Sequence, residues 1–277
     1  MLKKAYIEIT NRCNMHCAFC PGTKREGRTM RAEEFALVLD KLTGTVEYIY
    51  LHVMGEPLSH PRLGELLQIA NEKKMHVCIT TNGTLLARQY ETLLAADALY
   101  KVSVSLHSFE GNGLESAQYL EDIWRFADAA SKRGVIVALR LWNEGGAEEQ
   151  NDAICAFLLE KCGLDELPEE KKGGIRLREK LYLERAKKFD WPDLSASEQS
   201  TQFCYALRDQ LGVLADGTVV PCCLDHEGDI ALGNLFTQEL SEILESPRAK
   251  ALKDGFSRRC PSEELCRRCG YASRFTK

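Results

Sequence analysis

The sequence predicts an α/β protein: a partial (β/α)6 TIM-like barrel over residues 1–195, then a small domain of a β-hairpin plus a helix over residues 196–277. Short strand-like runs alternate with helical segments through the first part of the chain. This alternation indicates a parallel sheet with right-handed crossovers. Six strand–helix units are too few to close an eight-stranded barrel, so we expect an open one. Near residue 200 the pattern changes to a hairpin and a cysteine-rich tail.

The predicted strands are short runs rich in β-branched, aromatic and other apolar residues. They are Ala5–Thr10, Val46–Val53, His76–Thr80, Lys101–Leu106, Val135–Leu141 and Gly174–Leu177. Helical spacing of apolar residues predicts the intervening helices, namely Arg31–Leu42, Arg62–Lys73, Leu85–Ala95, Leu114–Lys132 and Asp152–Cys162. Thr29 is the expected cap of the first helix, and Gly134 and Gly163 are expected to end the last two.

The second part of the chain follows a polar segment, Arg178–Ser200, which we interpret as a linker. After it, Leu211–Leu214 and Val219–Cys222 flank an Asp-Gly dipeptide, which predicts a β-hairpin. A helix over about Gln238–Glu245 and the cysteine-rich tail complete the predicted second domain.

The composition is that of a globular protein, with 44% hydrophobic and 28% charged residues among 277. The net charge of −5 gives no reason to expect nucleic acid or a membrane as a partner. Residues 1–4 (MLKK) lead into a strand and not into the apolar segment of a secretory signal. No apolar run reaches the length of a membrane span. We therefore expect a cytoplasmic protein.

The twelve cysteines are the unusual feature of the composition. Disulfides are rare in a reducing compartment, where grouped cysteines more often bind metal. Cys78, Cys155 and Cys162 stand alone in apolar or helical segments and are interpreted as small core residues. The other cysteines form a front group and a back group: Cys13, Cys17 and Cys20, then Cys204, Cys222, Cys223, Cys260, Cys266 and Cys269.

The front cysteines have the spacing Cys13-x3-Cys17-x2-Cys20 in the loop after the first strand. Three thiolates in one loop are able to hold a [4Fe–4S] cluster and to leave one iron open for a small molecule. A zinc site with His16 as fourth ligand is the alternative, but the usual paired spacing of zinc ligands is absent here.

This front motif, with the aromatic Phe19 before its last cysteine, resembles that of the radical S-adenosylmethionine (SAM) superfamily over about residues 5–180. The resemblance implies that Cys13, Cys17 and Cys20 hold the catalytic cluster. It also implies that the open iron chelates the amino and carboxylate groups of SAM, and that Phe19 lies against the adenine.

Small or polar residues follow five predicted strands, at the end of a parallel barrel where ligands bind. The segment Met54-Gly55-Glu56 resembles the Gly-Gly-Glu segment that contacts the SAM amine in this superfamily, with Met54 in place of the first glycine. Gly55 lets backbone approach a ligand, and an exposed carbonyl or Glu56 is able to accept hydrogen bonds from an ammonium group. The predicted SAM-binding residues are Phe19, Gly55, Glu56, Asn82, Ser105, Arg140 and Asn143.

Each of these residues also has a structural interpretation. Glu56 is suited to a turn, residues 80–83 to capping the next helix, and Arg140 to an ion pair as well as to a ligand carboxylate. Lys24, Arg25 and Arg28 follow the cysteine loop and are interpreted as a solvated charge run, with a docking site for an electron donor as the alternative.

The back cysteines place Cys204 before the predicted hairpin and Cys222 at its end, followed by Cys266-x2-Cys269. This tail resembles the auxiliary-cluster domains of radical SAM enzymes called SPASM and, in shortened form, twitch. The resemblance implies a second [4Fe–4S] cluster with these four ligands, in which Cys223 or Cys260 is able to replace a neighbour. A four-cysteine zinc site is the alternative, since four thiolates serve both metals.

The two resemblances together imply an enzyme that cleaves SAM reductively to a 5′-deoxyadenosyl radical, which removes a hydrogen atom from a substrate. The auxiliary cluster would assist a net oxidation or crosslinking of a peptide, a protein or a sugar-like alcohol. The expected electron donor is a flavodoxin or a ferredoxin. The alternative is a cysteine-rich metal-binding or redox-sensing protein without SAM chemistry.

Overall fold

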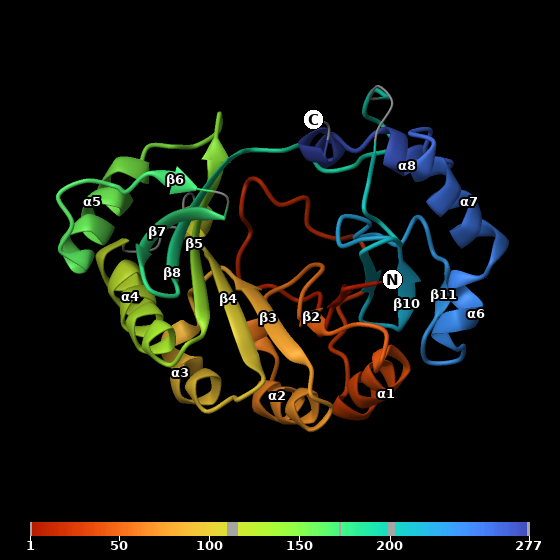
Figure 1. Cartoon of the computed structure of the whole chain (residues 1–277), viewed down its shortest axis with the longest axis horizontal. Coiled ribbons are helices and arrows are strands. Elements are labelled where there is room, and N and C mark those ends of the chain that lie inside the picture. The colour runs from red at the N-terminus through yellow and green to blue at the C-terminus, as the bar shows by residue number, and fades with distance from the viewer. Residues whose placement is uncertain (1, 110–115, 172, 199–202, 276–277) are drawn as a thin grey trace.

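The computed structural model describes residues 2–109, 116–171, 173–198 and 203–275. One curved sheet runs through the molecule in the strand order β11-β10-β9-β1-β2-β3-β4-β5-β8-β7-β6. Helices cover its outer face, and the sheet does not close on itself (Figure 1). The predicted partial barrel is therefore confirmed.

The parallel strands of the barrel start with β1 and continue in chain order around the sheet. They are β1 (Lys4–Ile7), β2 (Tyr48–Tyr50), β3 (His76–Thr81), β4 (Leu99–Ser105), β5 (Ile136–Glu144) and β8 (Leu181–Lys187). The outer helices are α1 (Ala32–Leu42), α2 (Leu63–Glu72), α3 (Leu86–Leu94), α4 (Ser116–Lys132) and α5 (Asn151–Cys162). All five helices and the first five strands lie where the sequence predicts them. Leu114, the predicted start of the fourth helix, and Ser200, the predicted end of the linker, lie outside the described residues.

The sixth parallel strand differs from the prediction. The predicted strand is β7 (Gly174–Arg178), but β7 runs antiparallel to β8 and to the short β6 (Glu170–Lys171). The sixth parallel strand is β8, which lies inside the segment interpreted as a linker. Leu181 and Leu183 are fully buried and alternate with the half-buried Tyr182 and Glu184. The segment looks polar because one face of this strand carries polar residues.

The first helix begins with a different cap from the predicted one. Arg31 is the N-cap of α1, and the backbone N–H of Arg31 donates to the side chain of Glu34 at 2.9 Å. Thr29 instead pairs with Thr10 in an isolated β-bridge, which closes the base of the loop that carries the front cysteines. The prediction for Thr29 was therefore wrong, while Gly163 ends α5 in a left-handed conformation as expected.

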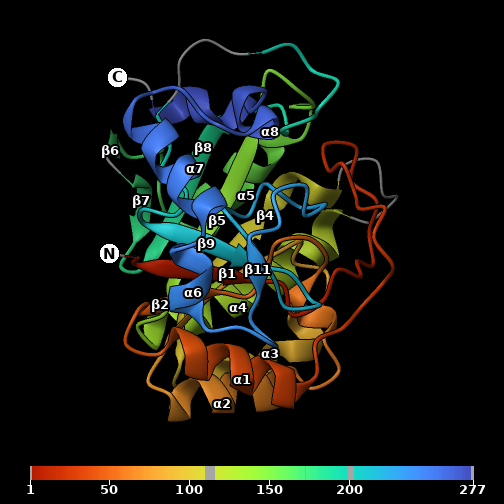
Figure 2. The same cartoon turned by 90° about the vertical axis from the view of Figure 1, so that its right-hand side faces the viewer.

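The last part of the chain adds strands to the same sheet. β9 (Gln210–Val213) and β10 (Thr218–Val220) form the predicted hairpin, and β10 also pairs with β11 (Gly233–Asn234). β9 lies parallel to β1, so the hairpin continues the barrel sheet on its open side (Figure 2). The predicted helix is present as α6 (Leu240–Leu244).

Two further helices and a final turn follow, which the sequence analysis did not predict. α7 (Pro247–Ser257) starts at Ser246, whose side chain accepts a hydrogen bond from the N–H of Ala249, with a proline in the first turn. α8 (Glu264–Arg267) and a 3-10 turn (Gly270–Phe275) carry the last cysteines. None of the helices in the described part of the chain is long and apolar enough to cross a membrane.

The hydrophobic core fills the space between the sheet and the outer helices. Its largest fully buried side chains include Phe35 of α1 and Phe126 of α4, and Ile49 of β2 and Val77 of β3 are also inaccessible to solvent. This layer leaves the inner face of the sheet available for other residues.

Candidate functional site

A cavity of about 970 Å³ lies on the inner face of the sheet, between the barrel strands and the C-terminal segments. All predicted site residues except Asn143 line it: Cys13, Cys17, Phe19, Cys20, Gly55, Glu56, Asn82, Ser105, Arg140, Cys204, Cys222, Cys266 and Cys269. The two cysteine groups, which are far apart in the sequence, thus open onto one space.

The front cysteines lie in a loop that is fastened at several points. The backbone N–H of Cys20 donates to the carbonyl of Cys17 at 3.0 Å, which forms a tight turn between two of the thiols. The amide of Asn82 lies 3.9 Å from the sulfur of Cys13 and donates to Asn14 at 3.0 Å. Burial raises the pKa of the Cys13 thiol, so metal binding there must displace a proton at neutral pH.

Gly55 packs directly against the backbone of the cysteine loop. Its φ is +78°, and a Cβ atom on it would lie 2.3 Å from the carbonyl oxygen of Thr10 and 2.8 Å from that of Arg12. The next N–H, that of Glu56, donates to the Arg12 carbonyl at 2.9 Å. Only glycine fits this position, because any side chain would push the two loops apart.

Glu56 is buried, with 2% of its surface exposed, and its carboxylate accepts hydrogen bonds from other groups of the protein. One oxygen accepts hydrogen bonds from the N–H of Leu58 at 3.0 Å and the hydroxyl of Thr81 at 2.7 Å. The other accepts from the N–H of Asn82 at 2.8 Å. Burial raises the pKa of Glu56 to about 7, against the effect of these donors. Glu56 therefore holds the end of β3 and places Asn82 at the cavity.

Arg140 and Ser105 line the cavity from neighbouring strands. The Arg140 guanidinium lies 3.0 Å from the Glu184 carboxylate and 3.4 Å from the Thr80 hydroxyl, and it stacks over the ring of Trp142. Arg140 thus forms the structural ion pair that the sequence analysis kept as an alternative, and it also lines the cavity wall.

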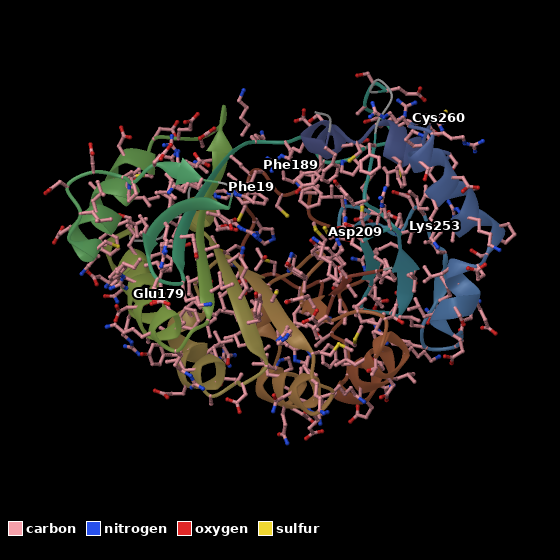
Figure 3. The ribbon with its side chains drawn as sticks, viewed as in Figure 1. Phe19, Glu179, Phe189, Asp209, Lys253 and Cys260 are labelled. Carbon is pink, nitrogen blue, oxygen red and sulfur yellow. The ribbon has the colours of Figure 1, made fainter. Side chains whose placement is uncertain are left out.

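Of the remaining two predicted SAM-binding residues, Phe19 lines the cavity and Asn143 does not. The Asn143 amide donates to the carbonyl of Ala147 and to Asn151, so this side chain closes the loop after β5 and does not line the cavity. Phe19 lies at the rim of the cavity with its ring centre 4.6 Å from that of His107 (Figure 3).

The sequence analysis missed Glu8, which lies at the end of β1 and is fully buried. Its carboxylate accepts two hydrogen bonds from Arg25 and one each from the N–H groups of Met54 and Ala215. A charged residue in an otherwise apolar strand was the available signal. The interpretation of Arg25 as part of a solvated charge run was wrong, because Arg25 also donates to the carbonyl of His226 at 2.8 Å.

The other basic residues after the cysteine loop are also engaged with the protein. Arg28 pairs with Glu34 at 2.8 Å and donates to the carbonyl of Ala215. The backbone N–H of Lys24 donates to Glu227 at 3.1 Å. These contacts connect the cysteine loop to the C-terminal part of the chain.

The back cysteines converge at the other side of the cavity. Burial raises the pKa of Cys204 to about 11, and the neighbouring thiols of Cys269 and Cys223 act in the same direction. Burial and then the thiols of Cys204 and Cys269 raise the pKa of Cys266. Thiolates packed in this way repel one another, so their shared ionisation needs a cation between them. This donor set fits an iron–sulfur cluster.

The two remaining back cysteines are placed differently. Cys223 lines the cavity and packs with Tyr6, and burial raises its pKa to about 11. Cys260 is exposed at the outer edge of the C-terminal part and does not line the cavity (Figure 3). In the described residues, no three Cys, His, Asp or Glu side chains surround one ion. A [4Fe–4S] cluster instead takes one thiolate per iron.

Comparison with known families identifies two parts of the chain. The radical SAM superfamily matches residues 7–144, and the iron–sulfur cluster-binding domain called SPASM matches residues 204–270. The chain belongs to the radical SAM superfamily. As a radical SAM protein with a SPASM domain, it uses SAM and more than one [4Fe–4S] cluster. The resemblances stated from the two cysteine motifs are thereby confirmed.

Curated relatives include two GTP 3′,8-cyclases. The probable GTP 3′,8-cyclase of Methanosarcina mazei is 26% identical over 298 residues, which cover 92% of this chain and 85% of that protein. The GTP 3′,8-cyclase of Chlorobaculum tepidum is 34% identical over 108 residues, and this match spans 38% of this chain and only 32% of that protein.

Solved structures share the fold at low sequence identity. BtrN in complex with AdoMet and 2-DOIA matches 97% of this chain and 93% of its own with a TM-score of 0.59 and 18% identity. Streptococcus suis SuiB bound to the precursor peptide SuiA matches 98% of this chain and 71% of its own, with a TM-score of 0.66 and 16% identity.

Proposed function

We propose that this radical SAM enzyme cleaves SAM reductively and abstracts a hydrogen atom from a substrate bound in the cavity, with the auxiliary cluster assisting a net oxidation or crosslinking. The observation that carries the proposal is that both cysteine groups and the polar strand ends line one cavity. A metal-binding or redox-sensing protein has no need of a ligand cavity between its two cysteine groups.

Each cysteine group has a distinct role in the proposal. Cys13, Cys17 and Cys20 would hold the cluster that leaves one iron open to SAM, and the back cysteines would hold the auxiliary cluster through Cys204, Cys222, Cys266 and Cys269. When bound, these clusters and SAM supply the one-electron chemistry: reduction, release of the 5′-deoxyadenosyl radical and acceptance of the second substrate electron.

The protein contributes binding and orientation. Phe19 offers a ring for the adenine at the rim, and Asn82 and Ser105 offer polar groups at the ends of β3 and β4. The backbone carbonyls of the turn at Gly55 are the acceptors for the SAM amine, because the Glu56 carboxylate is already satisfied by three donors. The Arg140 guanidinium is available for a ligand carboxylate on its cavity side.

Aromatic residues shield the reacting space from water. Phe189 and Trp191 lie at the cavity with ring centres 5.5 Å apart, and Phe189 also contacts Tyr271 at 5.0 Å. The indole N–H of Trp191 donates to the carbonyl of Phe19 at 3.2 Å, which joins this wall to the cysteine loop. Exclusion of water protects a reactive radical from side reactions.

The proposed substrates are a peptide or protein, or a sugar-like alcohol. The similar fold of SuiB with its precursor peptide supports the first class, and that of BtrN with 2-DOIA supports the second. A flavodoxin or ferredoxin is the proposed electron donor. Replacing dithionite by reduced flavodoxin in the assay described next tests this partner.

The test is SAM cleavage by the anaerobically reconstituted protein. Wild-type protein given SAM and dithionite is expected to release 5′-deoxyadenosine, measured by liquid chromatography. Cys17→Ala is expected to abolish the release, whereas Cys260→Ala, the matched control on the outer surface, is expected to keep it. No 5′-deoxyadenosine from fully iron-loaded wild-type protein would overturn the proposal in favour of a redox-sensing function.

A further inference from the structure

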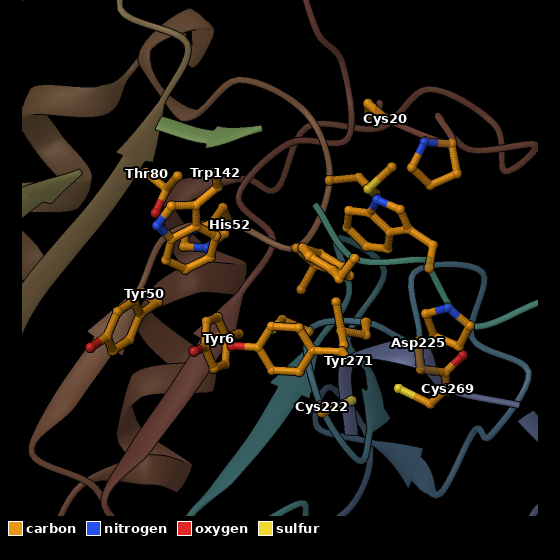
Figure 4. A pocket seen from close by; sticks show the side chains of 18 of the residues that line it. Tyr6, Cys20, Tyr50, His52, Thr80, Trp142, Cys222, Asp225, Cys269 and Tyr271 are labelled. Carbon is orange, nitrogen blue, oxygen red and sulfur yellow. The ribbon is translucent and has the colours of Figure 1, made fainter. Parts of the chain in front are cut away.

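The inner face of the partial barrel carries polar and aromatic residues where a closed barrel is packed with branched apolar side chains. Lys4 and Tyr6 line the cavity from β1 and Tyr50 from β2, and His52 is the second residue after β2. Figure 4 shows Tyr6, Tyr50 and His52 side by side on one wall of the cavity. Such a surface is suited to binding a polar ligand rather than to filling a core.

The Lys4 ammonium is held in place by two rings. It lies 5.4 Å from the ring centre of Tyr6 and 5.3 Å from that of Tyr50, whose rings are themselves 4.8 Å apart. In the described part of the chain, no carboxylate lies within ion-pair distance of the Lys4 ammonium. The neighbouring Asp209 carboxylate pairs with Lys3 instead, at 3.5 Å. Burial lowers the pKa of Lys4, and the acidic groups around it, Asp209 and the thiols of Cys223 and Cys78, do not offset this effect.

The carboxylate of Glu184, on the same wall, is already paired with two other cations. Arg140 and Lys101 share one carboxylate, that of Glu184, at 3.0 and 2.9 Å. This wall of the cavity therefore has an excess of positive charge. Lys4 is half-buried, and a partly desolvated cation without a carboxylate partner is stabilised by a ligand anion.

His52 adds a hydrogen-bonding group to the same place. Its ring packs edge-on against Tyr6 at 5.5 Å and Tyr50 at 6.1 Å. The Nδ1 atom is buried and has no hydrogen-bond partner among the described residues. Buried polar atoms are nearly always satisfied in native proteins, so an orphan beside an unpaired ammonium indicates a ligand group.

We propose that Lys4, Tyr6, Tyr50 and His52 form a subsite that binds an anionic group, a carboxylate or a phosphate, of the enzyme's substrate. This subsite rests on the proposed function in taking the cavity as the substrate site. Lys4 supplies the charge, the tyrosine rings fix its position and contact the adjoining part of the ligand, and His52 supplies a hydrogen bond.

The position of the subsite also limits the shape of the substrate. Lys4 starts β1 and Ile7 ends it, three residues and roughly 10 Å further along the strand, and the cysteine loop follows beyond that end. A substrate that reaches both places is extended, with its anionic group remote from the carbon that loses hydrogen. An acidic peptide side chain or C-terminus satisfies this, as does a phosphorylated or carboxylated small molecule.

The experiment measures binding of small anions to the reconstituted, SAM-bound enzyme by anaerobic calorimetry. The probes are 4-hydroxyphenylacetate, phenyl phosphate and the neutral 4-hydroxyphenylacetamide. Either anion is expected to bind more tightly than the amide, and the better anion identifies the source of the charge. Lys4→Gln is expected to weaken that binding by about tenfold or more. Lys4→Arg is expected to restore most of it, and Lys132→Gln, a surface control paired with Asp128, is expected to change nothing.

The outcomes separate this inference from the proposed function. Loss of anion binding in folded Lys4→Gln supports the subsite. Lys132→Gln is the variant expected to keep the wild-type release of 5′-deoxyadenosine, and that release by the wild-type protein tests the proposed function separately. Equal binding of the three probes, or unchanged anion binding in folded Lys4→Gln, overturns the subsite and leaves SAM cleavage untouched. If Lys4→Gln does not fold, His52→Phe decides, because it removes the unpartnered Nδ1 and keeps an aromatic ring. Weaker anion binding in this variant supports the subsite, and unchanged anion binding overturns it.

Discussion

The carboxylate of Glu8 and the guanidinium of Arg25 form a two-point ion pair, with nitrogen–oxygen distances of 2.6 and 2.8 Å. Glu8 is fully buried at the end of β1, and the Arg25 side chain is 17% exposed. The pair joins three places at once, because Glu8 also accepts from Met54 and Ala215. The cysteine loop, the turn after β2 and the C-terminal hairpin are thus fixed relative to one another by one carboxylate.

Removing Arg25 is expected to destabilise the protein strongly. Arg25→Met leaves the Glu8 carboxylate buried without its cation, a change that costs about 3–5 kcal/mol in buried pairs. At this chain length, the expected fall in the melting temperature of the reconstituted protein is roughly 10 °C. The double variant Glu8→Gln/Arg25→Met should regain part of the loss. Arg62→Met, which removes the exposed pair with Glu65, is the control, with a cost below about 1 kcal/mol.

Gly55 and Gly44 provide a matched test of the contact between the turn after β2 and the cysteine loop. Both have φ +78°, but a Cβ on Gly44 meets nothing within 4 Å. Gly44→Ala is expected to cost only the left-handed strain of about 1–2 kcal/mol. Gly55→Ala adds the clash with Thr10 and Arg12, so it should also reduce iron content and SAM affinity. Equal effects of the two substitutions on iron content would show that the loop does not depend on this contact.

The buried Glu56 predicts a pH-dependent contribution to stability. Its pKa is raised to about 7 from 4.5, so the folded state binds this proton more tightly than the unfolded state does. The resulting stabilisation is complete below about pH 4.5 and is lost as the pH rises through 7. Glu56→Gln lacks this dependence. The stability of wild type relative to Glu56→Gln should therefore fall by roughly 3 kcal/mol over this range, measured by thermal melts. A constant difference would contradict the assignment.

The auxiliary cluster is tested through its buried cysteines. Cys266→Ala is expected to lower the iron content of the reconstituted protein by about half, because each cluster holds the same number of irons. SAM cleavage without substrate should persist in this variant, since the front cysteines are intact. Cys260→Ala should retain full iron content. Elemental analysis that finds zinc in place of iron at the back cysteines would contradict the prediction and identify a four-cysteine zinc site.

Much of the barrel was predictable because its outer layers follow simple periodicities. Helices such as α1 bury one face with Phe35 and Leu39, and central strands such as β3 bury a short run of apolar residues that includes Val77 and Ile79. β8 was missed for a physical reason: Glu184 on its inner face pairs with Lys101 and Arg140, so the strand has the composition of a loop.

The candidate site was predictable in its cysteines and less so in its polar contacts. Spacing identifies the front and back cysteines, since chemistry requires them in groups. The sequence cannot show that the Glu56 carboxylate is already bonded to Thr81, or that Asn143 turns toward Asn151. Nor does it reveal the role of Glu8, whose partners come from residues up to Ala215. These facts depend on long-range packing.

The parallel pairing of β1 with β9, in which Ala5 lies opposite Leu211, has a consequence for how the molecule is made. As the ribosome releases the chain, β1 emerges first but keeps one unpaired edge until the residues around Val213 have been synthesised. Contacts between such distant segments form late in folding. The cysteine loop anchored on β1 therefore reaches its final shape only after β9 has been synthesised and paired, and iron insertion into the front site should follow that pairing.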